Sequence, residues 1–339
     1  MGDVLSNLWV ILFGLGVLAF IVVAGIRVGV TFLIRRLASL IFITLCISFI
    51  TFILGYFAPG DVVYIQLGQH YNPHTAMQLR HFYGLDLPWY VQYAHYLGGL
   101  LHFDLGSSWI DETKTVNQIL SLYLPASIEL GVGGTILSVV MGVPLGVASA
   151  IRTNTWFDTT NQFIALVAYV LPVFVIIPFY DVAIIFLHNL GVWTLATSGW
   201  GTWDTELAPI LIFAIDSYGY YVRFTRSVLL EELSKDYIRT ARAKGLTEAV
   251  VIWRHAFRNT LIPLLTAIGP ELGSVVGGLF IIESLMNVPG IGFEGLVAIT
   301  SHDVPVIQGT TIILAVSIVF ANFVTDVAYG FADPRIKTN

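Results

Sequence analysis

Apolar stretches of twenty residues or more recur along this chain, and they limit the possible folds more than any other feature. A helix of about 20 residues covers the roughly 30 Å of hydrocarbon in a bilayer. The composition agrees, because 56% of the residues are hydrophobic and only 11% are charged. Soluble proteins carry about 25% charged residues. We therefore expect an all-α polytopic membrane protein.

Charge places the predicted spans relative to the two sides of the membrane. The seven apolar runs are residues 4–26, 37–58, 125–150, 159–187, 208–230, 261–286 and 306–330. Basic residues mark the cytoplasmic side, and 14 of the 16 lie on predicted cytoplasmic segments or helix ends, all except Arg80 and Lys114. The pattern predicts an N-terminus outside the cell and a cytoplasmic C-terminus. Pro172 and Pro178 are expected to bend the fourth run.

The first run has two interpretations, a signal peptide or a retained helix. Asp3 precedes it without any Lys or Arg, and no small-x-small cleavage site stands out, so the pattern favours an extra transmembrane helix over residues 1–30. Cys46 is the single cysteine. It cannot form an internal disulfide, and its place in an apolar run predicts a packing role.

Residues 61–124 are mixed in polarity and fit the outer side. Short amphipathic helices are expected at about 72–83 and 88–102. Five histidines gather in this segment: His70, His74, His81, His95 and His102. A metal site is one interpretation, but no cysteine or paired carboxylate completes a ligand set. Solvated or interfacial histidines are the favoured alternative.

One polar segment, Glu231 to Pro263, interrupts the apolar runs. Between Arg223 and Arg258 the chain carries eight basic and four acidic residues, too many charges for hydrocarbon. Asp236 to Lys244 reads as a short helix that Gly245 stops. Ala241 and Gly245 are four apart and share a face, and Ala243 adds a third small residue, so another surface can approach closely.

A second helical stretch is expected from Glu248 to Arg258 in the polar segment. Val250, Trp253 and Phe257 would line one face of it. Arg254 and Arg258 would lie on another face. The two stretches together predict a compact basic knob held against the membrane.

The polar segment resembles the coupling loop, or "EAA" loop, of ABC-importer permeases, and most of all that of the B-type subunit of dipeptide, oligopeptide and nickel permeases. The matching residues are Asp236–Leu246, Arg254–Asn259 and Pro263. Where the general motif has Glu-Ala-Ala, this chain has Arg239-Thr240-Ala241, a departure typical of the peptide subfamily. The resemblance covers about residues 32–338, in five motifs in the right order.

Two motifs nearer the C-terminus also resemble that family. Residues 283–292 are similar to its E…PGLG element, and residues 303–309 to its D-Y-P-V-x-Q-G stretch. The resemblance extends to the start of the first core helix and to the end of the last one, where Asp326 is expected to be structural. Glu283, Pro289, Gly290 and Gly292 are candidates for an outer gate. A loop that caps a helix is the equal alternative.

The resemblance implies a six-helix type I ABC-importer permease core plus the extra N-terminal helix. The expected division is residues 1–30, then 31–124 with the first core helix and the extracytoplasmic segment, then a permease core over 125–338 with its cytoplasmic coupling loop at 231–260. The expected partners are a second homologous permease subunit, two ATP-binding subunits, an extracytoplasmic substrate-binding protein and the lipid bilayer, with no nucleic acid. The implied ATPase contact is made by Asp236, Arg239, Ala241, Ala243, Lys244, Gly245 and Leu246.

The chain carries no Walker-type phosphate loop and no zinc spacing. We therefore expect no enzyme activity of its own and no cofactor in this chain, with ATP and Mg bound by the partner ATPases. Alternating access is the implied mechanism.

Three acidic residues fall inside apolar runs: Asp181, Asp216 and Glu271. A charge at the bilayer centre costs on the order of 3 kcal/mol, so such residues tend to face a cavity or a partner. One hypothesis is that they line a translocation pathway and favour the amine of a peptide. The alternative is a hydrogen-bonded packing residue, or one near the interface.

Di- and oligopeptides are the first expectation for the cargo. Oligosaccharides and nickel chelates are alternatives within the same transporter type. Two other classes are an ion-coupled secondary transporter, which the intramembrane carboxylates would suit, and a membrane scaffold without transport. Neither needs a coupling loop.

Overall fold

A computed structural model describes residues 30–57, 62–192 and 195–332. The predicted helix at 4–26 lies outside the described residues. So do the motif ends at 58–61 and 333–336. Within the described residues the named elements are all helical, and one isolated bridge joins Ser107 to Thr115. The predicted all-α fold is confirmed.

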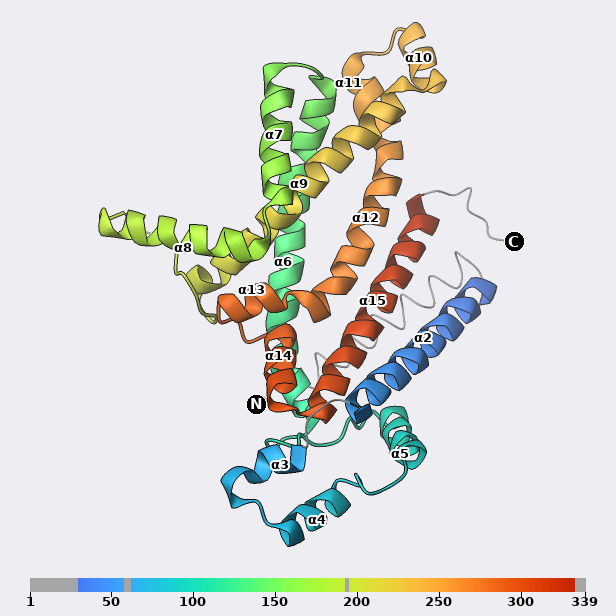
Figure 1. The fold of residues 1–339 in the computed structure, drawn as a ribbon. Helices are drawn as coiled ribbons and strands as arrows, with labels where there is room; N and C mark the ends of the chain where they lie inside the picture. Colours follow the sequence, from blue (N-terminus) through green and yellow to red (C-terminus); the bar gives the residue numbers. More distant parts are fainter. Residues whose placement is uncertain (1–29, 58–61, 193–194, 333–339) are drawn as a thin grey trace, which may run out of the picture.

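Long helices run between two ends of the molecule (Figure 1). They are α2 (Val30–Phe57), α6 (Val116–Ile151), α7 (Trp156–Val170), α9 (Trp203–Ser234), α12 (Phe257–Gly278) and α15 (Val304–Ala332). At one end lie α10 (Asp236–Ala243) and α11 (Glu248–Val250). At the other lie α3 (Val62–Leu67), α4 (Pro73–Phe82) and α5 (Trp89–Leu101). We call these the α10 end and the α4 end.

Three described helices are long and apolar enough to cross a membrane, namely α2 through Leu37–Phe57, α6, and α15 through Val304–Thr325. Taken together, α7 and α8 (Val173–Asn189) are also long and apolar enough to cross a membrane, but the chain bends by 107° between them. The six predicted core spans correspond to α2, α6, this bent pair, α9, α12 and α15.

The bend at Pro172 is much sharper than the kink expected from the sequence. Pro172 stands between α7 and α8, whereas Pro178 lies inside α8 without ending it. As a result α8 projects sideways from the long helices (Figure 1). The bend expected at Pro172 is therefore confirmed, but it separates two helices, whereas Pro178 leaves α8 continuous.

The predicted run 261–286 is also divided, because α12 ends at Gly278 and the short α13 (Phe280–Leu285) turns away from it. The next element, α14 (Ile291–Ser301), begins after Gly290. Two expected short helices are confirmed as α4 and α5, whereas α3 was not foreseen.

Glycines allow the long helices to pack closely. A Cβ on Gly142 would stand 2.7 Å from the Cβ of Tyr221, and one on Gly219 would stand 2.2 Å from the carbonyl oxygen of Ala165. These contacts join α6 to α9 and α9 to α7. Small residues at helix crossings are the usual device for packing in a bilayer, where lipid tails leave little hydrophobic driving force between helices.

Candidate functional site

The helix at the centre of the polar segment forms where the sequence predicts it. Lys235 precedes it in an extended conformation, and Asp236 stands in the first turn, where the helix dipole favours an acid. The helix ends at Ala243, and Gly245 has a φ of 76°. Only glycine adopts this left-handed conformation without strain. The prediction of a helix that Gly245 stops is confirmed.

Two side chains fix α10 to the rest of the chain. Ile238 and Ala241 are buried in an apolar cluster that also holds Val147, Leu229 and Val251. The expectation that Ala241 and Gly245 share an outward face is therefore wrong. Ala241 lets α10 approach the chain's own helices, whereas Ala243, Lys244, Gly245 and Leu246 remain exposed.

The exposed side of α10 carries ion pairs. Arg239 Nη1 lies 3.3 Å from Asp236 Oδ1. Arg242 binds both oxygens of Glu248, at 2.8 and 3.2 Å. Hydrogen bonds from Arg242 lower the pKa of Glu248 below its ordinary value. Pairs at such exposed positions contribute little to stability, so these side chains can exchange partners at low cost.

A polar network joins α10 to the two long helices beside it. Glu232, near the end of α9, accepts hydrogen bonds from Lys235 and from the Tyr237 hydroxyl. Asn259 of α12 donates to the same hydroxyl at 2.9 Å. Burial, followed by the Glu232 hydrogen bond, raises the pKa of Tyr237 to about 12. The Tyr237 hydroxyl thus connects α10 to both α9 and α12.

Sequence reasoning missed this network, although its members all lie in the polar segment, because Glu232, Tyr237 and Asn259 fall on three different helices. The available signal was Asn259, a polar residue at the start of an apolar run, in a motif already noted for its resemblance. Nothing in the spacing pairs it with Tyr237, 22 residues earlier.

The second stretch of the polar segment is not the regular helix that was predicted. A π-helical segment, Val251–Ala256, lies between α11 and α12. It buries Val251, Ile252 and Ala256. The rings of Trp253 and Phe257 do lie side by side, with centroids 5.2 Å apart, but Trp253 is exposed, so the predicted apolar face is only partly covered. π-Helical turns carry an extra residue per turn, which moves side chains off the α-helical spacing.

Two of the three intramembrane acids come together. Asp216 of α9 and Glu271 of α12 lie within electrostatic reach of each other. The buried Tyr221 hydroxyl donates to Glu271 Oε2. Asp181 stands on α8, and its Oδ1 is buried without a hydrogen-bond partner among the described residues. The contact with Tyr221 matches the alternative interpretation of Glu271, a hydrogen-bonded packing residue.

Another buried acid, Asp158, pairs with Arg226, which lies just before the polar segment. Arg226 of α9 binds both oxygens of Asp158 at 2.7 Å, and the Asp158 side chain is 4% exposed. This bidentate pair ties α9 to the start of α7. An arginine inside an apolar run requires a nearby anion. The position of Arg226 in the run 208–230 was therefore a sequence signal that it has an acidic partner.

The four candidate gate residues lie close together in the chain: Glu283 is on α13, Pro289 and Gly290 are in the turn that follows, and Gly292 is in the first turn of α14. Glu283 is 0% exposed and accepts hydrogen bonds from Ser127 Oγ at 2.8 Å and from the Phe293 backbone at 2.9 Å. A Cβ on Gly290 would stand 2.3 Å from the Glu283 carboxyl carbon. The turn is thus wrapped around the carboxylate, while Pro289 faces outward.

Asp303 ties the start of α15 to the loop before α6. Its carboxylate is buried and accepts hydrogen bonds from the Ser108 hydroxyl and, at 3.2 Å, from the Trp109 backbone. The donors lie 194 and 195 residues away in sequence. The sequence motif located Asp303 but gave no indication of these partners.

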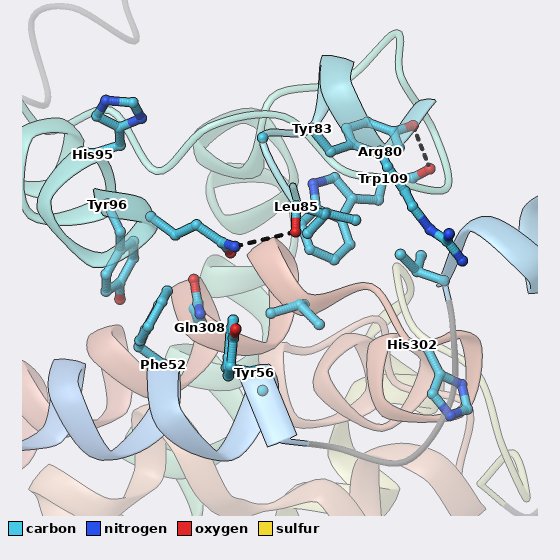
Figure 2. A pocket seen from close by; sticks show the side chains of 15 residues that line it. Phe52, Tyr56, Arg80, Tyr83, Leu85, His95, Tyr96, Trp109, His302 and Gln308 are labelled. Atoms are coloured by element: carbon cyan, nitrogen blue, oxygen red, sulfur yellow. Dashed lines mark hydrogen bonds between the residues drawn. The ribbon is translucent and has the colours of Figure 1, made fainter. Parts of the chain in front are cut away.

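Figure 2 shows a cavity of about 520 Å³ at the α4 end, between the ends of α2 and α15 and the helices α4 and α5. Phe52 and Tyr56 of α2 and Gln308 of α15 form one side, and Tyr96 of α5 lies across from them. The rings of Phe52 and Tyr96 are stacked 6.4 Å apart. The lining combines aromatic rings with polar side chains such as Arg80, Gln92 and Gln308. The Tyr96 hydroxyl is buried without a hydrogen-bond partner in the described part of the chain.

Two histidines of the predicted cluster make local contacts instead of gathering. His81 Nδ1 lies 2.7 Å from Asp86 Oδ2, and His102 Nδ1 lies 2.8 Å from the Gly98 carbonyl oxygen. The Asp86 hydrogen bond raises the pKa of His81. Among the described residues no three His, Cys, Asp or Glu side chains stand close enough to share a metal ion.

Comparison with known proteins gives a consistent result. Residues 142–338 match the family described as binding-protein-dependent transport system inner membrane component, and residues 29–128 match the N-terminal family of the same systems. A chain of the MetNI methionine ABC transporter, inward facing, has a TM-score of 0.49 and 16% identity over 62% of this chain and 96% of its own, which is too weak a likeness to add to the fold.

Curated relatives match along nearly their whole length. The dipeptide transport system permease protein DppB of Bacillus subtilis (strain 168) is 34% identical over 90% of this chain and 97% of its own. A putative peptide transport system permease protein of Brucella abortus (strain 2308) is 34% identical over 90% and 98%. With α10 and its flanking helices in place, these matches show that this chain belongs to the family of binding-protein-dependent transport system inner membrane components.

Proposed function

We propose that this chain is a membrane subunit of an ATP-driven importer for short peptides, with α10 as the contact for a partner ATPase. The observation that carries the proposal is the construction of the α10 end. A short basic helix is exposed on one side and is joined on the other, through Glu232, Tyr237 and Asn259, to α9 and α12. Force applied to α10 therefore reaches two long helices.

The peptide cargo is supported by the names of the relatives, which are peptide and dipeptide permeases. Membership of this transport family supports the ATP requirement, and a sequence without a phosphate loop is consistent with ATP being bound by partner subunits. ATP and Mg would be bound by two partner ATPases, and a second permease subunit and a substrate-binding protein would complete the assembly. In this proposal the α10 end and the C-terminus are cytoplasmic, and the α4 end lies outside the cell.

ATP binding drives alternating access only if it distinguishes the two states of the membrane helices energetically. The site proposed for that distinction comprises Asp236, Arg239, Ala243, Lys244, Gly245 and Leu246, which are exposed, together with Ala241, which positions α10 from beneath.

The intramembrane acids Asp216 and Glu271 are proposed to line the pathway and to favour the peptide amine. Their proximity on α9 and α12, the helices that α10 would move, supports this role. Alanine at each position should weaken transport of a dipeptide. Unchanged transport and affinity in both variants would rule the pathway role out, and Asp181→Ala is the comparison expected to have the smaller effect.

The test of the proposed function is affinity purification from native membranes with mass spectrometry of the bound proteins. Wild type should retain ATPase subunits, and Gly245→Arg should lose them. Gly191→Arg is the matched control, because both glycines have nearly the same φ, 75° and 76°, and both face open space. An ATPase retained by Gly245→Arg, or absent from wild type in mild detergent, would contradict the proposal.

A further inference from the structure

A second polar cavity lies at the α4 end, apart from the aromatic one. Its volume is about 480 Å³. It is bounded by the loop before α6, the first turns of α6 and one side of α14. The charged and polar residues that matter for its chemistry are Asp111, Lys114, Tyr123, Glu294, Ser301 and Asp303.

The charges in this cavity do not balance. Among the described residues that line this cavity, Lys114 is the one basic residue. Its ammonium lies 2.9 Å from Asp111, with both side chains about half exposed. Glu294 is partly buried and hydrogen-bonds the Tyr123 hydroxyl. Asp303 is already engaged by Ser108 and Trp109. Three carboxylates thus surround one ammonium. The hydrogen bond to Glu294 comes from the neutral Tyr123 hydroxyl, and Lys114 acts on Glu294 as a nearby charge.

A partly desolvated carboxylate gains most from a cation that reaches it directly. The cavity is large enough for a small organic ligand, and the single ammonium of Lys114 stands at its edge. A ligand that carried only a positive charge would be repelled by the Lys114 ammonium. A ligand with both charges would complement Glu294 and Lys114 together.

We propose that this cavity binds a small zwitterion, with Glu294 taking the ligand's ammonium group and Lys114 taking its carboxylate or phosphate. Two sources supply this chemistry at the outer side of a membrane, a short peptide and the phosphoethanolamine headgroup of a lipid. The peptide source rests on the proposed function. The aromatic cavity of Figure 2 does not fit such a ligand, since its lining contains no carboxylate among the described residues.

The test measures equilibrium binding to the purified transporter complex in nanodiscs of phosphatidylcholine, without ATP and without the substrate-binding protein. Radiolabelled dialanine is the first probe, and phosphoethanolamine is the second. Glu294→Gln should weaken binding of the recognised probe at least tenfold. Tyr123→Phe should weaken it less, because the carboxylate remains. Asp86→Asn, which removes an exposed carboxylate at the same end, should leave binding unchanged.

Competitors identify the group that is recognised. N-acetyl-dialanine lacks the ammonium and should not compete, whereas dialanine amide, which lacks only the carboxylate, should compete weakly. Nanodiscs that contain phosphatidylethanolamine distinguish the sources, because a lipid occupant would co-purify with wild type and be lost in Glu294→Gln. Either source supports the inference.

Equal binding of either probe to wild type and Glu294→Gln, or equal competition by N-acetyl-dialanine, would overturn the inference. So would the absence of both dialanine binding and an associated phosphatidylethanolamine. These results leave the importer proposal intact if ATPases still co-purify and dipeptide uptake persists. Conversely, if the protein bound dialanine through Glu294 but retained no ATPase, the proposed function would be wrong and the binding site would stand.

Discussion

The carboxylates of α13 and of the start of α15 are held differently from those on the exposed side of α10. Glu283 of α13 and Asp303, which directly precedes α15, are buried and accept hydrogen bonds from segments far away in sequence. At the α10 end, Asp236 and Glu248 are exposed and pair with arginines of the same short segment. The first arrangement joins separate helices, whereas the second leaves a charged surface open.

The difference shows how one chain combines a fixed part with an accessible one. Removing a donor or acceptor from a buried network leaves its partners unsatisfied, which is costly. Removing one member of an exposed pair returns the other to water at little cost. Stability is thus concentrated around the buried carboxylates, and the surface available for contact is at α10, where the anchor is the small cluster around Ile238 and Ala241.

The largest effect is expected for Glu283→Ala. It removes the acceptor for Ser127 and for the Phe293 backbone and should lower the free energy of unfolding by about 3 kcal/mol, since each buried unsatisfied donor costs roughly 1 to 3 kcal/mol. Thermal unfolding of the detergent-purified complex measures this loss. Glu231→Ala, at an exposed position of the α10 end, is the control and should change stability by less than about 0.5 kcal/mol. Similar losses in both variants would break the comparison between the buried and the exposed carboxylates.

A smaller effect on stability, with a larger one on function, is expected for Tyr237→Phe. The ring stays in place, but the hydroxyl that links Glu232 to Asn259 is lost. Such a change costs on the order of 1 kcal/mol. The ratio of peptide transported to ATP hydrolysed should fall while ATPase subunits still co-purify. Tyr90→Phe, at an exposed position of the α4 end, should leave the ratio unchanged. An unaltered ratio in Tyr237→Phe would show that α10 moves the long helices by another route.

The smallest effect is expected for the pair of Arg242 and Glu248. Because the pKa of Glu248 is lowered by Arg242, the pair contributes stability above the unfolded value of about 4.3, and that contribution is lost as the pH falls through the folded pKa. Glu248→Gln should abolish this pH-dependent part without a measurable change in unfolding at neutral pH. An NMR titration of Glu248 in wild type and in Arg242→Gln would follow the shift directly. A pKa in wild type at or above the ordinary value would contradict the structure.

Local patterns predicted much of the fold. The apolar run before residue 58 gave α2, the turn residues around 72 and 88 gave α4 and α5, and Gly245 gave the end of α10. Each of these depends on residues close together in the chain. The family was also identified from motifs of this kind, because each motif is a continuous stretch.

The features that the sequence did not predict depend on contacts between distant segments. The angle between α7 and α8 and the break after Gly278 are set by what the helices pack against, and a proline or glycine alone does not fix them. The partners of Glu283 and Asp303 lie 156 and 195 residues away, so spacing could not reveal them. The inward side of Ala241 likewise depends on Val147 and Leu229, which come from two other helices.

The π-helical segment at Val251–Ala256 also sets the register between the two halves of the polar segment. A π-helical turn holds one more residue than an α-helical turn, whereas one extra residue in an unbroken α-helix would turn whatever precedes it by about 100°. The wider turn therefore absorbs the surplus residue where it lies and leaves the helix on either side in line. The length of this segment can thus vary by one residue without redirecting the exposed side of α10.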